Sequence, residues 1–196
     1  MSDVMDLEKK RCAWVKLSDP LYVAYHDNEW GKPLHGEQAL FELFSLETQS
    51  AGLSWLTVLK KREGYREVFY NFDLQKVALF LEADIERIMQ SGKAIKSVPK
   101  IKAIIENAKG FLQITDEFGS IDNYFWSKVA HKPIRNDVDN YKHAQTTSDI
   151  SDVITKDLKK RGFKFIGSVT IYAFMQACGM VDDHEHGCFC KHPSIK

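Results

Sequence analysis

Imidazole and thiol groups crowd the segment 183–192, which reads DHEHGCFCKH. Within it, His184 and Cys188 are four residues apart, so one helical face or one tight turn can bring them together. Cys12 and His26 lie near the other end of the chain. Two cysteines and two histidines form the tetrahedral shell of a closed structural zinc site. We therefore predict one structural zinc per chain, which joins the two ends and takes no part in chemistry.

Other interpretations of these residues remain open. His186, Cys190 and His192 are rival ligands in the same segment. A tail with incidental thiols would bind no metal at all. A three-ligand shell with an open position would instead make the protein a zinc hydrolase, and Cys188→Ala would then abolish turnover rather than only destabilise the fold.

A second group of candidates combines aromatic with acidic side chains in the segments 19–31 and 46–55. The first segment offers Tyr22, Tyr25, His26, Asp27, Glu29 and Trp30, and the second offers Glu47 and Trp55. Aromatic rings attract a flat cationic base with about 0.5–2 kcal/mol each. A carboxylate adds charge-assisted hydrogen bonds of roughly 1.5–3 kcal/mol. The alternative is that the rings belong to the core and that Glu47 is a surface residue.

Helical periodicity dominates the elements that must position these residues. Apolar residues recur every three or four positions over Glu37–Gln49. Further helices are expected at Trp55–Leu59, around Val77–Leu81 and Ile85–Met89 with starts at Asp73 and Glu82, at Ile101–Leu112, and at Val153–Leu158 with Ser148 or Ser151 as the cap. No window alternates as a strand does, and the polar stretch 132–147 is expected to be a loop. The predicted fold class is all-α.

The connection between two of these helices, 90–100, contains one glycine and one proline. Its candidate phosphate contacts are Lys93, Lys96, Lys100 and Lys102. A helix–turn–helix of this kind can present backbone N–H groups and lysines to a DNA phosphate. An ordinary connection with solvated lysines is the alternative.

Composition excludes some classes of protein. Lys+Arg and Asp+Glu both number 27 among 196 residues, which argues against a protein that coats nucleic acid non-specifically. The longest apolar stretch, 166–181, is too short to span a bilayer and is expected to be a buried helix. The first residues lack the apolar segment of a secretory signal. We expect a cytoplasmic protein without membrane contact, whose cysteines are thiols or metal ligands.

Several motifs resemble 3-methyladenine DNA glycosylase type I, a bacterial family of the helix-hairpin-helix superfamily. The resemblance extends from about Arg11 to Cys188. The matching stretches are RCAW at 11–14, DPLY at 19–22, YHDNEWG at 25–31, AGLSW at 51–55 with KKRE at 60–63, LKKRGFKF at 158–165, FMQACG at 174–179 and DH at 183–184.

This resemblance implies an all-α helix-hairpin-helix glycosylase over residues 1–196. Two lobes are expected, one at about 73–131 with the hairpin and one formed by 10–72 and 148–192 with the pocket and the zinc. The implied activity is hydrolysis of the N-glycosidic bond of 3-methyladenine in alkylated double-stranded DNA by base flipping. We expect a monomer that leaves an abasic site. A noncatalytic, zinc-clipped DNA-binding protein is the alternative.

The resemblance also implies residue roles. Glu47 matches the residue that reads the adenine edge, and we assign it the catalytic role through stabilisation of the cationic base. The remaining matches are Trp14, Tyr22, Tyr25 and Trp55 for base binding, Gly52, Leu53 and Lys100 for DNA binding, and Cys12, His26, His184 and Cys188 for zinc. The chain departs from the family at Ser50, at Pro99, which removes an N–H from the hairpin, and over 136–145.

Overall fold

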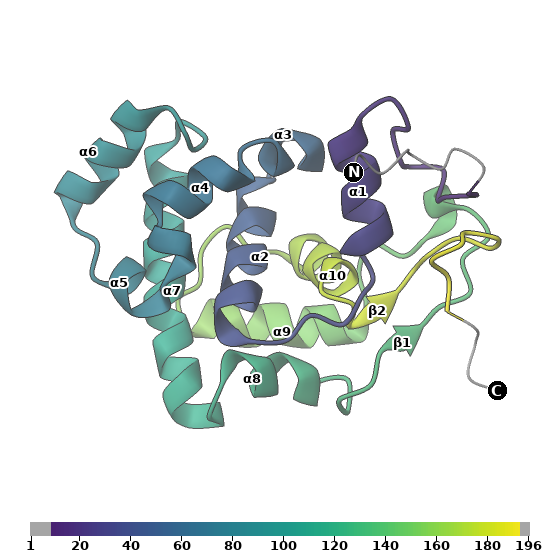
Figure 1. Cartoon of the computed structure of the whole chain (residues 1–196). Coiled ribbons are helices and arrows are strands. Elements are labelled where there is room, and N and C mark those ends of the chain that lie inside the picture. Colours follow the sequence, from purple (N-terminus) through teal and green to yellow (C-terminus); the bar gives the residue numbers. More distant parts are fainter. Residues whose placement is uncertain (1–8, 193–196) are drawn as a thin grey trace.

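The computed structural model describes residues 9–192, and helices make up most of its regular structure (Figure 1). The α-helices are α1 Pro20–Asn28, α2 Glu37–Gln49, α3 Trp55–Leu59, α4 Arg62–Val68, α5 Leu74–Ala78, α6 Glu82–Ser91, α7 Val98–Phe118, α8 Ile121–Ser127, α9 Asp149–Lys160 and α10 Ser168–Ala177. Two short 3-10 helices, η1 Tyr70–Phe72 and η2 Tyr141–His143, and two strands, β1 Ile134–Arg135 and β2 Val181–Asp182, complete the regular structure. None of the described helices is long and apolar enough to cross a membrane.

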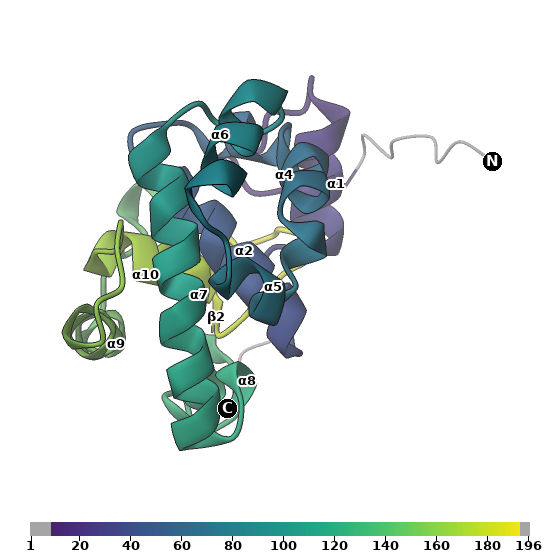
Figure 2. The same cartoon turned by 90° about the vertical axis from the view of Figure 1, so that its left-hand side faces the viewer.

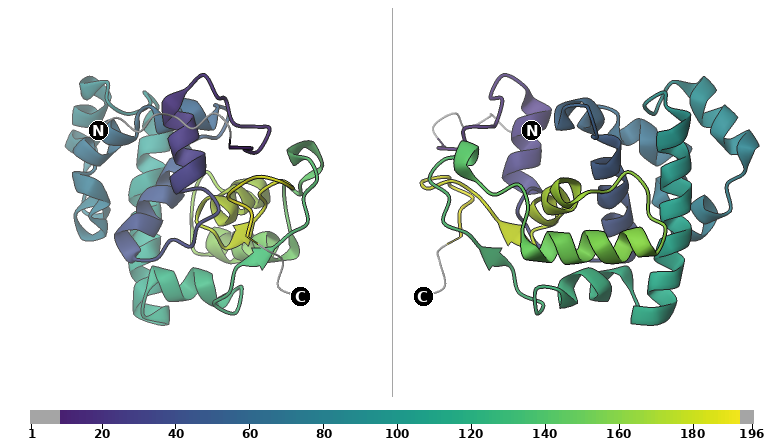
Figure 3. Two further views of the ribbon diagram at one scale, coloured as in Figure 1. Left: turned by 45° about the vertical axis from the view of Figure 1, so that its right-hand side comes forward. Right: turned by 180° about the vertical axis from the view of Figure 1, so that it is seen from behind.

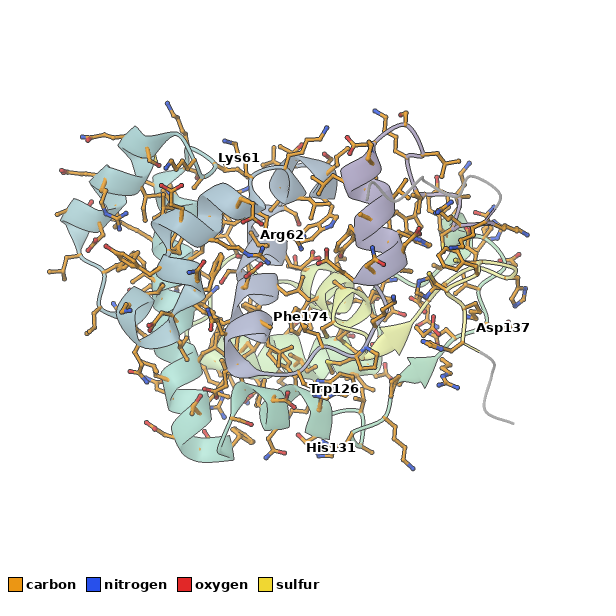
Figure 4. All side chains as sticks on the ribbon, viewed as in Figure 1. Lys61, Arg62, Trp126, His131, Asp137 and Phe174 are labelled. Atoms are coloured by element: carbon orange, nitrogen blue, oxygen red, sulfur yellow. The ribbon has the colours of Figure 1, made fainter. Side chains whose placement is uncertain are left out.

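Helix α2 lies at the centre of the molecule, with α10 beside it and the long helix α7 crossing its flank (Figures 1 and 2). The ring of Phe44 on α2 meets those of Phe111 on α7 and Phe174 on α10, at centroid distances of 4.9 and 5.4 Å. Phe174 points into this interior in Figure 4. Edge-to-face aromatic packing of this kind fixes the angles between the helices, so the pocket residues on α2 and α10 have a rigid support.

The connection between α6 and α7 is as short as the sequence predicted. Helix α6 ends at Gly92, whose left-handed backbone (φ 67°) suits a residue without a Cβ. Helix α7 then begins at Val98, with Pro99 in its first turn. A first-turn N–H has no partner inside the helix, so Pro99 breaks no helical hydrogen bond there.

Helix α9 covers the side of the molecule seen in the right-hand view of Figure 3, below α10. Ser148 caps it, as predicted, by accepting a hydrogen bond from the backbone N–H of Ser151. The loop from α9 to α10 is held by the buried amide of Asn107, which donates to Lys164 O at 3.2 Å and accepts from Lys164 N at 2.8 Å.

The stretch 132–147 is not the plain loop that the sequence predicted. Ile134 and Arg135 pair in parallel with Val181 and Asp182, on the right of Figure 1. An isolated bridge joins Val138 to Glu185, and η2 follows. Two-residue strands are too short to show alternation, and the partner that creates them lies more than 40 residues away, so a local pattern could not reveal them.

Candidate functional site: an aromatic pocket beside a cysteine and histidine cluster

A cavity of about 330 Å³ lies between the N-terminal segment, α1, the end of α2, the start of α3, α10 and the loop around η2. Its size is within the range of small-ligand sites. It is lined by Trp14, Tyr22, Tyr25, Trp30, Glu47, Trp55, Tyr141, Ala144, Gln145, Thr146, Val169, Tyr172, Ala173, Gln176 and Asp183. All the residues predicted to bind a base, together with Glu47, are among them.

Four predicted aromatic residues form a continuous wall. Tyr22 and Tyr25 are stacked, with centroids 6.5 Å apart and planes 10° apart. Trp14 packs on Tyr22 at 5.2 Å, and Trp55 packs on Tyr25 at 5.4 Å. Because Tyr22 and Tyr25 are three residues apart on α1, one helical face presents both rings. The wall offers aromatic faces to a planar guest.

Glu47 is the acidic group on the α2 side of the cavity. Its side chain is 6% exposed, and among the described residues no hydrogen bond satisfies its carboxyl group. Burial raises the pKa of Glu47 to about 8. At pH 7 the carboxyl is therefore mostly protonated in the empty cavity, and a positive charge beside it would favour the ionised form.

The pH dependence of the free energy of unfolding should reveal the burial of Glu47. The unfolded chain loses the Glu47 proton near the ordinary glutamate pKa of 4.5, whereas the folded protein keeps it to about 8. Between these values the folded state binds more protons, so this group lowers the free energy of unfolding as pH rises, by up to about 1.4 kcal/mol per pH unit.

Glu47→Gln should therefore gain stability relative to the wild type as pH rises from 5 to 8, by roughly 2–4 kcal/mol in all. Urea denaturation of both proteins at several pH values measures this difference. A difference that does not change with pH would show that Glu47 is ionised in the folded protein throughout this range.

Trp30, which the sequence placed in the aromatic and acidic group but not among the base-binding residues, lines the same cavity, and so do several polar residues that were not predicted. Asp183 accepts hydrogen bonds from Tyr172 Oη at 2.9 Å, from Gln176 Nε2 at 2.7 Å and from Asn136 Nδ2 at 2.7 Å. Three donors suit a carboxylate better than a carboxylic acid. The available signal was the i, i+4 spacing of Tyr172 and Gln176 on an otherwise apolar helix.

A group of metal-ligating side chains lies next to the pocket. Ligand atoms of His26, His184, Cys188 and Cys190 all lie within 4.8 Å of one another. This group contains three of the four predicted ligands and one of the predicted rivals. His184 and Cys188 meet in a turn that follows β2 and not on a helix.

Both imidazoles are oriented by carboxylates. His26 Nδ1 is 2.8 Å from Asp27 Oδ1, and His184 Nδ1 is 2.8 Å from Asp182 Oδ1. This leaves each Nε2 for the cluster, the arrangement that metal-binding histidines commonly have. His184 Nε2 is buried and has no hydrogen-bond partner in the described part of the chain. The donor set fits a soft divalent metal such as zinc.

The fourth predicted ligand, Cys12, lies at the edge of this group. It is 2% exposed, and its Sγ accepts the backbone N–H of Glu185 at 3.4 Å. The thiol of Cys190 is 3.9 Å from Asp27 O. His186 instead pairs with the exposed Asp137 at the right-hand edge of Figure 4.

Glu185 connects the cluster with two walls of the pocket. Its carboxylate accepts the N–H of Ala13, next to Trp14, and the N–H of Tyr141, both at 2.6 Å. Gly31 approaches the cluster closely, since a Cβ there would lie 2.4 Å from His184 Cε1. The cluster and the pocket walls are therefore packed as one unit.

The residues predicted to touch DNA lie in two places. Gly52 and Leu53 form an exposed turn after α2, where Leu53 is 43% exposed and Gly52 has φ 75°. Lys100 is only 9% exposed, and its ammonium donates to two backbone carbonyls. This geometry differs from the expected phosphate contact. Lys96 in the connection is exposed.

The chain is similar to known proteins over most of its length. A family description, methyladenine glycosylase, matches residues 14–191. DNA-3-methyladenine glycosylase 1 of Escherichia coli (strain K12) is 49% identical over 181 residues, which are 92% of this chain and 96% of the relative.

Solved structures agree as well. A crystal structure of 3-methyladenine DNA glycosylase I superposes with a TM-score of 0.90 at 48% identity, covering 93% of this chain and all of the other. A variant of such an enzyme in complex with 3-methyladenine superposes with a TM-score of 0.86 at 42% identity, covering 89% and 94% of the two chains. The chain belongs to the methyladenine glycosylase family.

Proposed function

We propose that the protein is a DNA-3-methyladenine glycosylase, which hydrolyses the N-glycosidic bond of 3-methyladenine in alkylated DNA and leaves an abasic site. One observation carries the proposal: a buried glutamate, with no hydrogen-bond partner for its carboxyl group within residues 9–192, faces a cavity walled by aromatic rings. The relatives named above have this activity in their names.

Recognition would use the charge and the flatness of the damaged base. 3-Methyladenine is cationic while it is attached to the sugar, so stacking on the aromatic wall and pairing with Glu47 both favour it over neutral adenine. Trp55 Nε1 is buried and has no acceptor in the part of the chain that the structure describes, so it is a further donor for the base. Leaving such a donor unpaired is costly, so a matching acceptor on the base adds selectivity.

The chemistry needs little acid catalysis. Because the base is cationic before cleavage and neutral afterwards, the bond breaks without protonation of the leaving group. Water then attacks an oxocarbenium-like sugar carbon. The protein's part is to hold the flipped nucleotide and to stabilise the positive charge. Glu47, ionised by the cation beside it, and the hydrogen-bonded Asp183 would supply the negative charge.

DNA contacts would come from the exposed turn and from the connection between α6 and α7. Leu53 is an exposed apolar residue on a tight turn, which suits insertion into the space that a flipped base leaves. The α6–α7 unit would be the helix-hairpin-helix, with backbone N–H groups and Lys96 directed to phosphate. A monomer fits this use, and a DNA substrate fits the cytoplasmic location that the sequence predicted.

Zinc would be structural. His26, His184 and Cys188 would bind it with Cys12 as the fourth ligand. The buried His184 Nε2, for which the described residues offer no hydrogen-bond partner, supports this. When bound, the metal supplies a cross-link between segments that are far apart in sequence. It would thereby keep Trp14 and Tyr25 over Glu47.

Release of free base from an alkylated duplex, measured with and without a chelator, tests the proposal. The expected result is release of 3-methyladenine without strand cleavage, since the ammonium of Lys100 is hydrogen-bonded to backbone carbonyls and no lysine of the described chain lines the cavity. Binding to alkylated DNA without base release would instead show the noncatalytic binding protein. Release that stops at once on chelation of a still-folded protein would show an open, catalytic metal.

A further inference from the structure

Lys100 has an unusual place for a lysine at the start of a helix. Its Nζ donates hydrogen bonds of 2.7 Å to Gln49 O and 2.7 Å to Ala51 O, at the C-terminal end of α2. The carbonyls at the end of a helix and in the turn after it have no partner inside the helix, and the end of a helix carries partial negative charge. A buried ammonium therefore caps α2 from another part of the chain.

The side-chain amide of Gln49 in turn hydrogen-bonds to the backbone of Lys100. Gln49 Nε2 donates to Lys100 O at 3.1 Å, and its Oε1 accepts from Tyr65 Oη at 3.1 Å. Tyr65 Oη in turn accepts the backbone N–H of Ile95 at 3.2 Å. Gln49 and Tyr65 are both 0% exposed. The side chains of Lys100, Gln49 and Tyr65 thus form one closed polar network, which we call the latch.

The latch joins two pieces of backbone that are distant in sequence. One is the connection 92–97, reached through Ile95 within it and through Lys100, which follows it in the first turn of α7. The other is the turn that follows α2 and carries Gly52 and Leu53. Lys61 adds a separate tie, since its Nζ donates to Gly92 O at 3.0 Å; it lies beside this connection at the top of Figure 4.

A polar network suits this joint because hydrogen bonds fix direction, whereas apolar contacts tolerate sliding. Each latch atom has a defined partner, so a shift of the turn by one ångström would break several bonds at once. Small displacements of positioning groups can lower a reaction rate about 100-fold.

We propose that Lys100, Gln49 and Tyr65 are positioning residues that hold the Gly52–Leu53 turn and the Glu47 end of α2 in a fixed relation to the α6–α7 connection. The connection that contacts the DNA backbone and the turn that inserts into the base stack then move as one rigid unit. The inference rests on the proposed DNA contacts of these two segments. It assigns Lys100 a role inside the protein in place of a phosphate contact.

Two variants and one control test the latch. Lys100→Met removes the ammonium but keeps the length of the side chain. Tyr65→Phe removes one hydroxyl from a fully buried side chain, which cannot touch DNA directly. Lys109→Met is the control, because Lys109 is an exposed lysine further along the same helix, paired with Glu106 at 2.7 Å.

Three quantities are measured for each protein: the single-turnover rate of 3-methyladenine release from alkylated duplex, the Kd for free 3-methyladenine, and the salt dependence of the Kd for duplex with an abasic site. We expect Lys100→Met to lower the rate at least tenfold and Tyr65→Phe about threefold. Both should bind the free base within about twofold of wild type and keep the wild-type salt slope. Lys109→Met should match the wild type in all three.

The opposite outcomes are equally distinct. A salt slope reduced by about 0.9 in Lys100→Met alone would mean that Lys100 contacts a phosphate, which would overturn the latch. Wild-type release rates in both variants would also overturn it. If Lys100→Met does not fold, Tyr65→Phe decides alone. If the wild type releases no 3-methyladenine, the proposed function fails, and not the latch.

Discussion

Glu47→Gln should lower the single-turnover rate of 3-methyladenine release about 100-fold, a loss of roughly 2.7 kcal/mol of transition-state stabilisation. Glutamine keeps the shape of the side chain and one hydrogen-bond acceptor, but it cannot balance the positive charge of the base. Glu63→Gln is the matched control, because the Glu63 side chain is 80% exposed and lies outside the cavity. Full activity of Glu47→Gln would contradict the role given to Glu47.

The pH profile separates loss of charge from loss of shape. Burial raises the pKa of Glu47 to about 8, and the ionised form complements a cationic base. The wild-type kcat/KM should therefore rise from pH 6 to about 8 and level off above it, since kcat/KM reports groups of the free enzyme. The Glu47→Gln profile should be flat over this range. A wild-type profile that is also flat would mean that Glu47 titrates outside this pH range or that its charge does not affect kcat/KM.

Cys188→Ala should have the second large effect, on stability. Protein purified without chelator should contain about one zinc per chain, and the variant should contain almost none. Because a structural zinc contributes folding free energy directly, the free energy of unfolding should fall by at least about 3 kcal/mol. Denaturant titration and metal analysis measure both changes. Unchanged stability with no metal in the wild type would end the zinc proposal.

The identity of the fourth ligand needs a matched pair of variants, Cys12→Ala and Cys190→Ala. If Cys12 binds the metal, only its replacement lowers the zinc content and the stability. The reverse result would assign the position to Cys190, whose thiol lies in the described cluster. In either case a folded variant that keeps its zinc but loses turnover would indicate catalysis at the metal.

Local sequence patterns predicted those helices whose buried face repeats regularly. Helix α2 has the predicted bounds, Glu37 to Gln49, because its apolar stripe is continuous. Helix α5 begins directly after the expected start residue Asp73, which caps it, but it ends at Ala78, three residues before the expected Leu81. The β1–β2 pair was missed because its partners meet only in the folded chain.

The site was predictable only in part for the same reason. The resemblance pointed to Glu47 and the four aromatic residues, and the structure brings them together in one cavity. Asp183 and Tyr141 line the same cavity but come from separate segments, so no local spacing marked them. The surroundings of Lys100 depend on carbonyls about 50 residues away, and its sequence neighbours gave no sign of burial.

The distribution of indole rings gives the protein a built-in optical probe. Of its four tryptophans, Trp14, Trp30 and Trp55 line the cavity. Trp126 lies apart in α8, where its Nε1 donates to Leu34 O at 3.0 Å (Figure 4). A guest in the cavity would change the emission of three fluorophores, while the fourth supplies a constant background. Occupancy by free base can therefore be followed without a label.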